Sequence, residues 1–353
     1  MPRSIPRTRH AVMTRPAVVG VALATLLALA LAGCNDKAAT PPPSAKSSGP
    51  SAQNTATGAT MTRQSPLTGK TVTGPPPKHP IMIVKIDNTA SSQPQIGLSK
   101  ADLVTEELVE GGSTRLAAFY DSKVPKVVGP VRSMRATDIG VVEPAHAVLV
   151  ASGGAPPTVR RVRAAHITTF TEGATGYYRE SSRPAPYNLF MHLPKLAKTL
   201  HKEAKKLGTP PSYLPFGGEA SFPKGQKAHG LDAKFSASHT TSWKYQHGTY
   251  TNLNSYAATG DRFHPDTILV MRVHEGDAGY LDPAGHHVPE TDLKGKGDAI
   301  VFHHGRMVRA TWVKKGLHMP IRLRTTAGSL KLPPGHVWIE MVPSNGGSVQ
   351  VTK

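Results

Sequence analysis

The chain has 353 residues and a formal net charge of +19, from 42 lysines and arginines against 23 aspartates and glutamates. It contains one cysteine, which excludes a fold held together by internal disulfide bonds. Hydrophobic residues make up 38% of the chain, enough for a packed core in a protein of this length.

The N-terminus predicts export and lipid anchoring. Four arginines within the first 15 residues precede an apolar run at 17–32, which is shorter than the about 20 residues of a membrane-spanning helix. The run ends in "LAGC", which looks like a bacterial lipobox, and the only cysteine, Cys34, falls where a lipobox requires it. The alternative is an uncleaved signal anchor with an incidental cysteine. We expect residues 1–33 to be a lipoprotein signal peptide and Cys34 to be the lipid attachment site.

This processing places the protein on the extracytoplasmic face of the cell membrane and changes its charge. Without the four arginines of residues 1–33, the chain has 38 basic and 23 acidic residues and a net charge of +15. Such a surplus favours an anionic wall polymer, a lipid head group or a protein as partner. The other interpretation is a generally basic, soluble surface. No nucleic acid is expected as a partner, because no DNA- or RNA-binding motif occurs.

Residues 34–75 predict a disordered tether, because Pro, Ser, Thr and Ala dominate and no hydrophobic period occurs. Such a segment cannot bury enough apolar surface to offset the entropy lost on folding. A flexible chain of about 40 residues spans roughly 35 Å, which would hold the folded part away from the bilayer.

Residues 76–208 predict an α/β domain, because strand and helix patterns alternate along them. The helix at 193–208 has leucines on one face and lysines around the rest, which favours packing on the sheet over contact with lipid. In chain order, we expect a strand at 79–88, a turn at 97–100, a strand that returns through Gly111 and Gly112 into a strand at 113–121, a strand at 126–131, a helix at 136–146, a strand at 147–154 and helices at 156–166 and 193–208.

The remainder of the chain has a different pattern. Residues 209–230 are rich in proline and glycine and predict a linker or insertion. Residues 231–347 contain short apolar runs separated by Gly, Asp and Pro, which predict a mostly-β domain. His304-Gly305 is expected to form a hairpin turn, and Trp312 and Trp338 to lie in the core. The predicted fold class is therefore α+β, with an N-terminal α/β domain and a mostly-β C-terminal domain.

Closely spaced arginines make the best candidate site in the sequence. Arginine forks suit phosphate and carboxylate groups, and glycine pairs allow backbone N–H groups to approach an anion. The helix that begins at Pro156 would add its N-terminus to the same sheet edge. The predicted anion-binding site comprises Arg115, Arg132, Ser133, Arg135, Gly111, Gly112, Gly153 and Gly154, with Glu107, Glu110 and Asp138 as supporting acids.

Two other interpretations of these arginines stay open. They could pair internally with Glu106, Glu107, Glu110 and Asp138 in a network that needs no ligand, or they could be incidental surface charge. The loop at 177–190, with its aromatic, Arg and Asn side chains, could bind a sugar or peptide, or could pack Tyr187 and Phe190 onto the domain.

No catalytic residue and no cofactor follow from the sequence. The chain has no G-x-S-x-G, H-E-x-x-H or P-loop motif and no second cysteine. The pairs His286-His287 and His303-His304 do not predict a metal site, because neighbouring side chains in a strand point to opposite faces. We therefore expect no metal and favour a binding or accessory module over an enzyme.

Several motifs in order resemble the DUF3048 family of bacterial lipoproteins of the YerB type. The resemblance covers about residues 77–345 and implies a two-domain surface lipoprotein, without implying a reaction. The motifs of the first domain are "QPQIGLSKADLV", "EELVEGGSTRLAAFY", "VGPVRSMRATD", "ASGG" and "RPAPYNLF". Those of the second are "GDAIVFHHGRMVRATWVKKG" and "LKLPPGHVWIEMVP".

An alternative function comes from a second resemblance. "STRLAAFY", "VVGPVRSMRATD" and "ASGG" are similar to the LytR-CpsA-Psr phosphotransferases, which bind a polyprenyl pyrophosphate with a metal through acidic and arginine residues. Ser113 and Thr114 stand where an acidic residue is expected, which counts against metal binding. Such an enzyme needs carboxylates that converge with the arginines and a long apolar groove for the prenyl chain, whereas a binding module needs neither.

Overall fold

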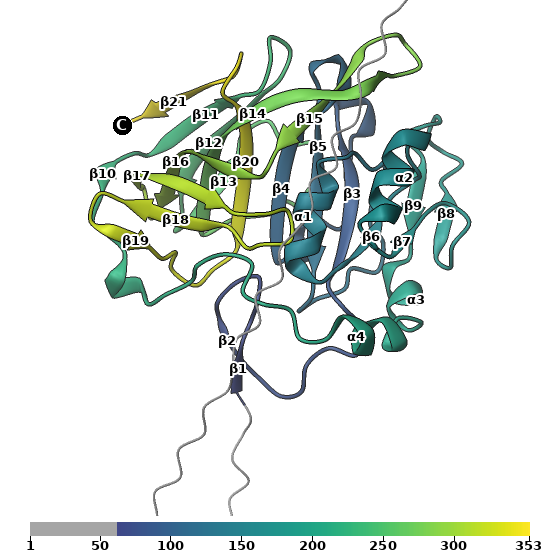
Figure 1. Ribbon diagram of the computed structural model, residues 1–353, viewed down its shortest axis with the longest axis horizontal. Helices are drawn as coiled ribbons and strands as arrows, with labels where there is room; N and C mark the ends of the chain where they lie inside the picture. The colour runs from purple at the N-terminus through teal and green to yellow at the C-terminus, as the bar shows by residue number, and fades with distance from the viewer. Residues whose placement is uncertain (1–61) are drawn as a thin grey trace, which may run out of the picture. The chain divides into compact units, whose positions relative to one another are not determined.

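The computed structural model describes residues 62–353 and is built around one large β-sheet (Figure 1). Its strand order is β19-β18-β17-β16-β14-β20-β4-β5-β3-β6-β7. Residues 76–208 supply β3 (Met82–Asn88), β4 (Leu103–Leu108), β5 (Thr114–Tyr120), β6 (Val148–Val150) and β7 (Thr169–Phe170). Residues 231–347 supply β14 (Thr267–Leu281), β16 (Gly295–His303), β17 (Arg306–Lys314), β18 (Arg322–Thr325), β19 (Gly328–Leu330) and β20 (Val337–Pro343).

Shorter strands and helices complete the fold. β10 (Gln226–Lys227) pairs with β17, and β15 (His287–Asp292) pairs with β14. A smaller sheet has the order β13-β12-β11-β21, from β11 (Gly230–Lys234), β12 (Thr240–Gln246), β13 (Thr249–Asn252) and β21 (Ser348–Thr352). Two hairpins are β1 (Thr62–Gln64) with β2 (Thr71–Thr73), and β8 (Tyr177–Arg179) with β9 (Leu189–Met191). The α-helices of the described residues are α1 (Asp138–Val142), α2 (Pro156–Ala164), α3 (Leu193–Ala197) and α4 (His201–Leu207).

The large sheet joins the two segments that the sequence separates. β4 and β20 pair in parallel, with Leu103 opposite Val337 and Glu106 opposite Glu340. Every residue of β20 is buried, as expected for a central strand covered on both faces. Strands from 76–208 and from 231–347 therefore share one hydrogen-bonded sheet, and the fold is mixed α+β.

Alternation along the strands sorts side chains into two cores, because successive residues of a strand point to opposite faces. One face of the large sheet packs with Trp243 and Tyr250 of the smaller sheet. The other face packs with Leu67, Tyr213 and Val142. Trp338 belongs to the first core and Trp312 to the second, which confirms both tryptophans as core residues.

Most of the predicted elements are present, and two differ. No strand forms at 126–131; Val128 and Val131 make isolated bridges, because Pro130 has no N–H group to continue a ladder. The predicted helix at 193–208 is divided into α3 and α4. The division lies at Thr199, whose backbone N–H and hydroxyl both donate to the Leu196 carbonyl, in place of an i→i−4 helical bond.

The predicted tether ends earlier than residue 75. Residues 62–73 form the β1–β2 hairpin, and Leu67 between its strands is fully buried. The predicted linker at 209–230 also packs into the fold, since Tyr213 and Leu214 are buried and the Tyr213 N–H donates to the Pro66 carbonyl. Apolar residues within otherwise Pro-rich segments draw both stretches onto the sheet.

The predicted signal peptide and Cys34 lie outside the described residues. Within residues 62–353, no helix combines the length and the apolar character needed to cross a bilayer.

Candidate anion-binding site

The three predicted arginines line one cavity of about 390 Å³. The outer wall comes from the turn of the β14–β15 hairpin, which reaches over this end of the sheet (Figure 1). The full lining is Glu110, Arg115, Arg132, Ser133, Arg135, Gly154, Ala155, Tyr280, Leu281, Asp282, Pro283 and Val288. The cavity therefore brings together residues from β5, from the loop before α1 and from a hairpin more than a hundred residues later.

Strand register places the first arginine among charged neighbours. Arg115 on β5 lies opposite Asp87 on β3 and opposite Glu107 on β4. Because directly opposed residues project from the same face of a sheet, the three charges are next to one another.

Glu110 is the shared partner of two arginines. Arg135 approaches it with Nε at 2.8 Å from Oε2 and with Nη2 close to Oε1, and Arg115 Nη2 lies 3.6 Å from the same Oε1. Burial disfavours the charged carboxylate, but the bonds from Arg135 and the charge of Arg115 outweigh it and hold the pKa of Glu110 below its ordinary value. Glu110 therefore stays ionised at neutral pH.

Arg132 is the most accessible of the three arginines. Its Nε lies 2.7 Å from Asp87 Oδ2, and its guanidinium sits 5.4 Å from the centre of the Tyr187 ring. Its side chain is 22% exposed, against 5% and 9% for Arg115 and Arg135. A ligand entering the cavity can therefore contact Arg132 without displacing the buried network.

Arg115 has unused hydrogen-bonding capacity. Its Nη1 donates to the Ser133 carbonyl at 2.9 Å, and its buried Nε has no hydrogen-bond partner among residues 62–353. Burial and the charge of Arg135 lower its pKa to about 10, so it remains protonated at neutral pH. Asp282 also lines the cavity, but its carboxylate accepts N–H groups of its own turn.

The arginines around the cavity are paired only in part. Within the described residues, three guanidinium groups face two directly paired carboxylates, those of Glu110 and Asp87, and Asp282 adds a third carboxylate to the lining, so the formal charges balance. What favours an anion is the set of guanidinium donors beside an open cavity, above all those of the partly exposed Arg132. The internal pairing that the sequence left open is therefore present, and the anion site stays a prediction.

Glu107 and Asp138 bind a lysine that the sequence analysis missed. Lys85 Nζ lies 2.5 Å from Glu107 Oε1 and 2.7 Å from Asp138 Oδ1, and all three side chains are at most 1% exposed. Asp138 Oδ2 also accepts the backbone N–H of Arg135 at 2.7 Å. Asp138 therefore binds the backbone of the arginine loop directly, and the side-chain cation that both acids pair with is Lys85. Charged residues at alternate positions of the apolar strand 82–88 are the signal that could have revealed Lys85 and Asp87.

The predicted glycines contribute unequally. Gly154 lines the cavity, and a Cβ there would come 2.8 Å from Met134 Cγ, so a larger residue would have to displace the Met134 side chain. Gly153 is outside the lining. Gly111 and Gly112 are outside it too. The Gly112 carbonyl instead accepts hydrogen bonds from the Ser236 and Ser238 hydroxyls, in the turn between β11 and β12.

Ser133 and the start of α2 act differently from the prediction. Ser133 lines the cavity and offers its carbonyl to Arg115, while its hydroxyl lies 3.2 Å from the Ser152 hydroxyl. Helix α2 begins next to the cavity, but its first two residues are Pro156 and Pro157, which have no N–H groups to donate to an anion. The predicted contribution of this helix N-terminus is therefore weakened.

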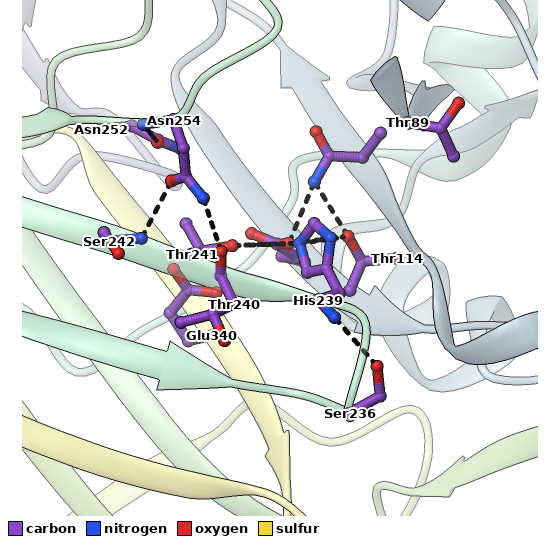
Figure 2. Close-up of polar contacts among 12 residues, drawn as sticks. Thr89, Thr114, Ser236, His239, Thr240, Thr241, Ser242, Asn252, Asn254 and Glu340 are labelled. Carbon is purple, nitrogen blue, oxygen red and sulfur yellow. Dashed lines mark hydrogen bonds and ion pairs between the residues drawn. The ribbon is translucent and has the colours of Figure 1, made fainter. Parts of the chain in front are cut away.

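A second polar network lies on the opposite face of the sheet, and the sequence analysis missed it (Figure 2). Glu106 Oε1 is its centre and is fully buried. Figure 2 shows the His239 ring beside Thr114 and Thr241. The donors to this one oxygen are His239 Nε2 at 2.8 Å, Thr114 Oγ1 at 2.7 Å, Thr241 Oγ1 at 2.9 Å and Asn88 Nδ2 at 3.0 Å.

Glu340 lies directly opposite Glu106 and is also fully buried. Burial and the charge of Glu106 raise the pKa of Glu340 well above its ordinary value, so Glu340 is a neutral acid beside an ionised one. Trp243 Nε1 donates to Glu340 Oε1 at 2.6 Å. Because neither carboxyl group reaches solvent, this network joins the two sheets and is not a site for a ligand.

Glu275 on β14 makes stability depend on pH. Its Oε1 accepts the Thr291 hydroxyl at 2.7 Å, and burial, with the nearby charges of Glu107 and Glu290, raises its pKa to about 8. The folded state thus binds the proton more tightly than the unfolded state, so this group costs stability as pH rises from about 4.5 towards 8. We expect Glu275→Gln, which cannot ionise, to gain up to about 4 kcal/mol over the wild type at pH 8 and little at pH 5.

Urea unfolding of both proteins from pH 5 to 8.5 measures this difference. Groups that titrate in both proteins cancel in the comparison, so only Glu275 contributes to a change in slope. Parallel pH curves would show that Glu275 does not have a raised pKa.

Comparison with known proteins places the chain in a family. The family model described as "Protein of unknown function (DUF3048) N-terminal domain" matches residues 67–207, and the model for the DUF3048 C-terminal domain matches residues 231–339. A Bacillus subtilis (strain 168) protein named "Putative lipoprotein YerB" is 25% identical over 297 residues, which cover 79% of this chain and 86% of that protein.

The fold is shared with a solved structure. The crystal structure of the YerB protein from Bacillus subtilis superposes with a TM-score of 0.67 at 22% sequence identity, over 82% of this chain and 99% of that chain. The two family matches, the ordered motifs and the shared fold agree, and the chain belongs to the DUF3048 family.

Proposed function

We propose that the protein is a lipid-anchored lipoprotein of the cell envelope that binds a phosphate-bearing ligand in the arginine-lined cavity. The anchor is Cys34, at the end of a lipobox-like sequence, and the name of the Bacillus subtilis relative supports a lipoprotein. The observation that carries the binding function is the meeting of three guanidinium groups around an open cavity of about 390 Å³, with the Arg132 side chain partly exposed.

The ligand follows from the chemistry of the cavity. A phosphate group presents oxygens that match the planar donors of a guanidinium. Arg132 offers the accessible donors, and Arg115 Nε is buried without a hydrogen-bond partner in the described part of the chain, residues 62–353. A phosphate group of a wall polymer or a lipid head group has this chemistry, and the basic surplus of the chain favours approach of either.

Phosphoryl transfer on a polyprenyl-pyrophosphate-linked substrate is the second candidate. The carboxylates of Asp87 and Glu110 do converge with the arginines, which is one of the two features that a transferase requires. The other is a long apolar groove, whereas the apolar part of this cavity lining is a short patch. It comprises Ala155, Val288, Pro283 and the last two residues of β14, Tyr280 and Leu281. A transferase would also need to free the carboxylates from the arginines in order to hold a metal ion.

Calorimetric titration of the full-length protein in detergent micelles tests both functions. The ligands are inorganic pyrophosphate and a short-chain polyprenyl pyrophosphate, each with and without Mg²⁺. We expect binding without Mg²⁺, weakened about 10- to 100-fold by Arg132→Ala, because a hydrogen bond to a charged group contributes about 1.5–3 kcal/mol.

Arg179→Ala is the matched control. Arg179 pairs with Glu172 outside the cavity, and its side chain is 45% exposed. This variant should bind like the wild type. Binding of the polyprenyl ligand only with Mg²⁺ would favour the transferase. An absence of heat with either ligand, together with a lower melting temperature for Arg132→Ala, would assign the arginines to internal ion pairing.

A further inference from the structure

The sequence predicts that His303 and His304 point to opposite faces of a strand, but their rings stack in the structure. His303 ends β16, and His304 is the first residue of the two-residue turn to β17. His304 has a left-handed φ of 47° and Gly305 a φ of 69°, which confirms the predicted hairpin turn. This conformation turns the His304 ring back onto His303, with 3.9 Å between ring centres. The expectation of opposite faces was wrong, because His304 is outside the strand.

Glu219 completes a group of three possible metal ligands. Its Oε1 lies 3.0 Å from His303 Nε2 and 3.5 Å from His304 Nδ1, and the ligand atoms of all three residues lie within 4.8 Å of one another. Ligands at about 2.1 Å from a tetrahedral zinc ion are about 3.4 Å apart. Small side-chain movements would therefore bring the three atoms into a coordination sphere.

The surroundings of His303 orient it as a ligand. The buried hydroxyl of Thr267 lies 2.8 Å from His303 Nδ1, which holds the ring so that Nε2 faces Glu219. A partner on the second ring nitrogen is typical of histidines that bind metals.

We propose that Glu219, His303 and His304 bind a zinc ion. Two imidazole nitrogens and one carboxylate oxygen are ligands that zinc accepts, and the fourth position would hold water. The side chains of His304 and Glu219 are 52% and 58% exposed, so an ion can reach the group from solvent.

The ion would link two parts of the chain that are far apart in sequence. Glu219 lies between the two family matches, in a segment that the sequence predicts to be a linker, whereas the histidines belong to the β16–β17 hairpin. Zinc would fix this segment on the hairpin. The site is separate from the arginine-lined cavity and does not depend on the function proposed for it, since the two share no residue.

The full-length protein in detergent, freed of metal with a chelator, is titrated with Zn²⁺ by calorimetry and with Co²⁺ by visible absorption. We expect one equivalent of Zn²⁺ to bind and to raise the melting temperature by several degrees, because an ion that binds only the folded state stabilises it. The absorption bands of bound Co²⁺ report directly on the coordination geometry.

His304→Asn and His247→Asn form a matched pair of variants. His247-Gly248 makes the same kind of turn between β12 and β13, with φ values of 52° and 84°, and His247 is not part of the ligand group. Asparagine tolerates the left-handed conformation, so both variants should fold. We expect His304→Asn and Glu219→Gln each to weaken Zn²⁺ binding at least about tenfold and His247→Asn to leave it unchanged.

Equal Zn²⁺ affinity in the wild type, His304→Asn and His247→Asn would overturn the proposal, because binding would then lie at other histidines. A wild-type protein without a Zn²⁺-dependent rise in melting temperature would also overturn it. Glu219 would then be a hydrogen-bond partner of the two imidazoles and nothing more.

Discussion

Replacing Lys85 with methionine is expected to destabilise the protein by about 3–5 kcal/mol, because it leaves two buried carboxylates without their cation. Lys85 is fully buried, and its ammonium group lies within 2.7 Å of both Glu107 and Asp138. Methionine has a similar length but no charge, so the expected loss is electrostatic and not a loss of packing. Urea unfolding at pH 7 measures the change, and a fall in melting temperature of about 10 °C should accompany it.

The pH dependence separates this explanation from a general packing defect. Burial and the charge of Asp138 already raise the pKa of Glu107, and Lys85 opposes that shift. Without Lys85 the folded-state pKa rises further above the unfolded value. The variant should therefore be closest to the wild type in mildly acidic solution and lose stability as pH rises.

Two further variants complete the test. Lys244→Met is the matched control, since Lys244 is an exposed lysine on a strand, and we expect it to change stability by less than about 0.5 kcal/mol. Lys85→Met combined with Glu107→Gln should recover part of the loss, because one of the two unpaired charges is removed. A Lys85→Met protein within about 1 kcal/mol of the wild type would contradict the buried ion-pair interpretation.

Glu106→Ala is expected to cost about 3–4 kcal/mol, because four donors lose one acceptor inside the protein. His239 and Thr241 come from the smaller sheet, whereas Thr114 and Asn88 come from the large one, and all of them donate to Glu106 Oε1. The substitution therefore weakens the joint between the sheets. Urea unfolding gives the free energy, and hydrogen exchange of β12 amides should rise in parallel.

Glu106→Gln provides a graded comparison, since it keeps one carbonyl acceptor and removes the charge. We expect its loss to be smaller than that of Glu106→Ala. Hydrogen bonds from His239, with its charge, outweigh burial and lower the pKa of Glu106. The stability that this carboxylate contributes is therefore present above about pH 4.5 and lost as pH falls below it, and both variants should lack this acidic decline. If both variants unfold like the wild type at pH 7, the network does not join the sheets.

The arginine cluster shows how far sequence patterns reach. Arg115, Arg132 and Arg135 are close in the chain, and the strands and loop that carry them were predicted from local apolar patterns, so their meeting at one cavity could be inferred. Their carboxylate partners could be inferred only in part. Glu110 was among the predicted acids, but Asp87 was not, because its position depends on the pairing of β3 with β5.

The charged residues of β4 show the limit most clearly. The alternation along the strand determines that Glu106 and Glu107 point to opposite faces. What each one meets depends on strands and turns far away in the chain: Glu340 and His239 on one face, Lys85 and Asp138 on the other. No local pattern contains that information.

The sequence by itself determined the alternating strands, the His304-Gly305 turn, the buried tryptophans and the ordered motifs of the family, because each of these depends on residues a few positions apart. Only the tertiary structure decided that β4 and β20 join two segments into one sheet and that Glu219 meets the histidine pair. Local conformation follows from short-range sterics and side-chain periodicity, whereas the neighbours of a buried charge follow from how the whole chain removes apolar surface from water.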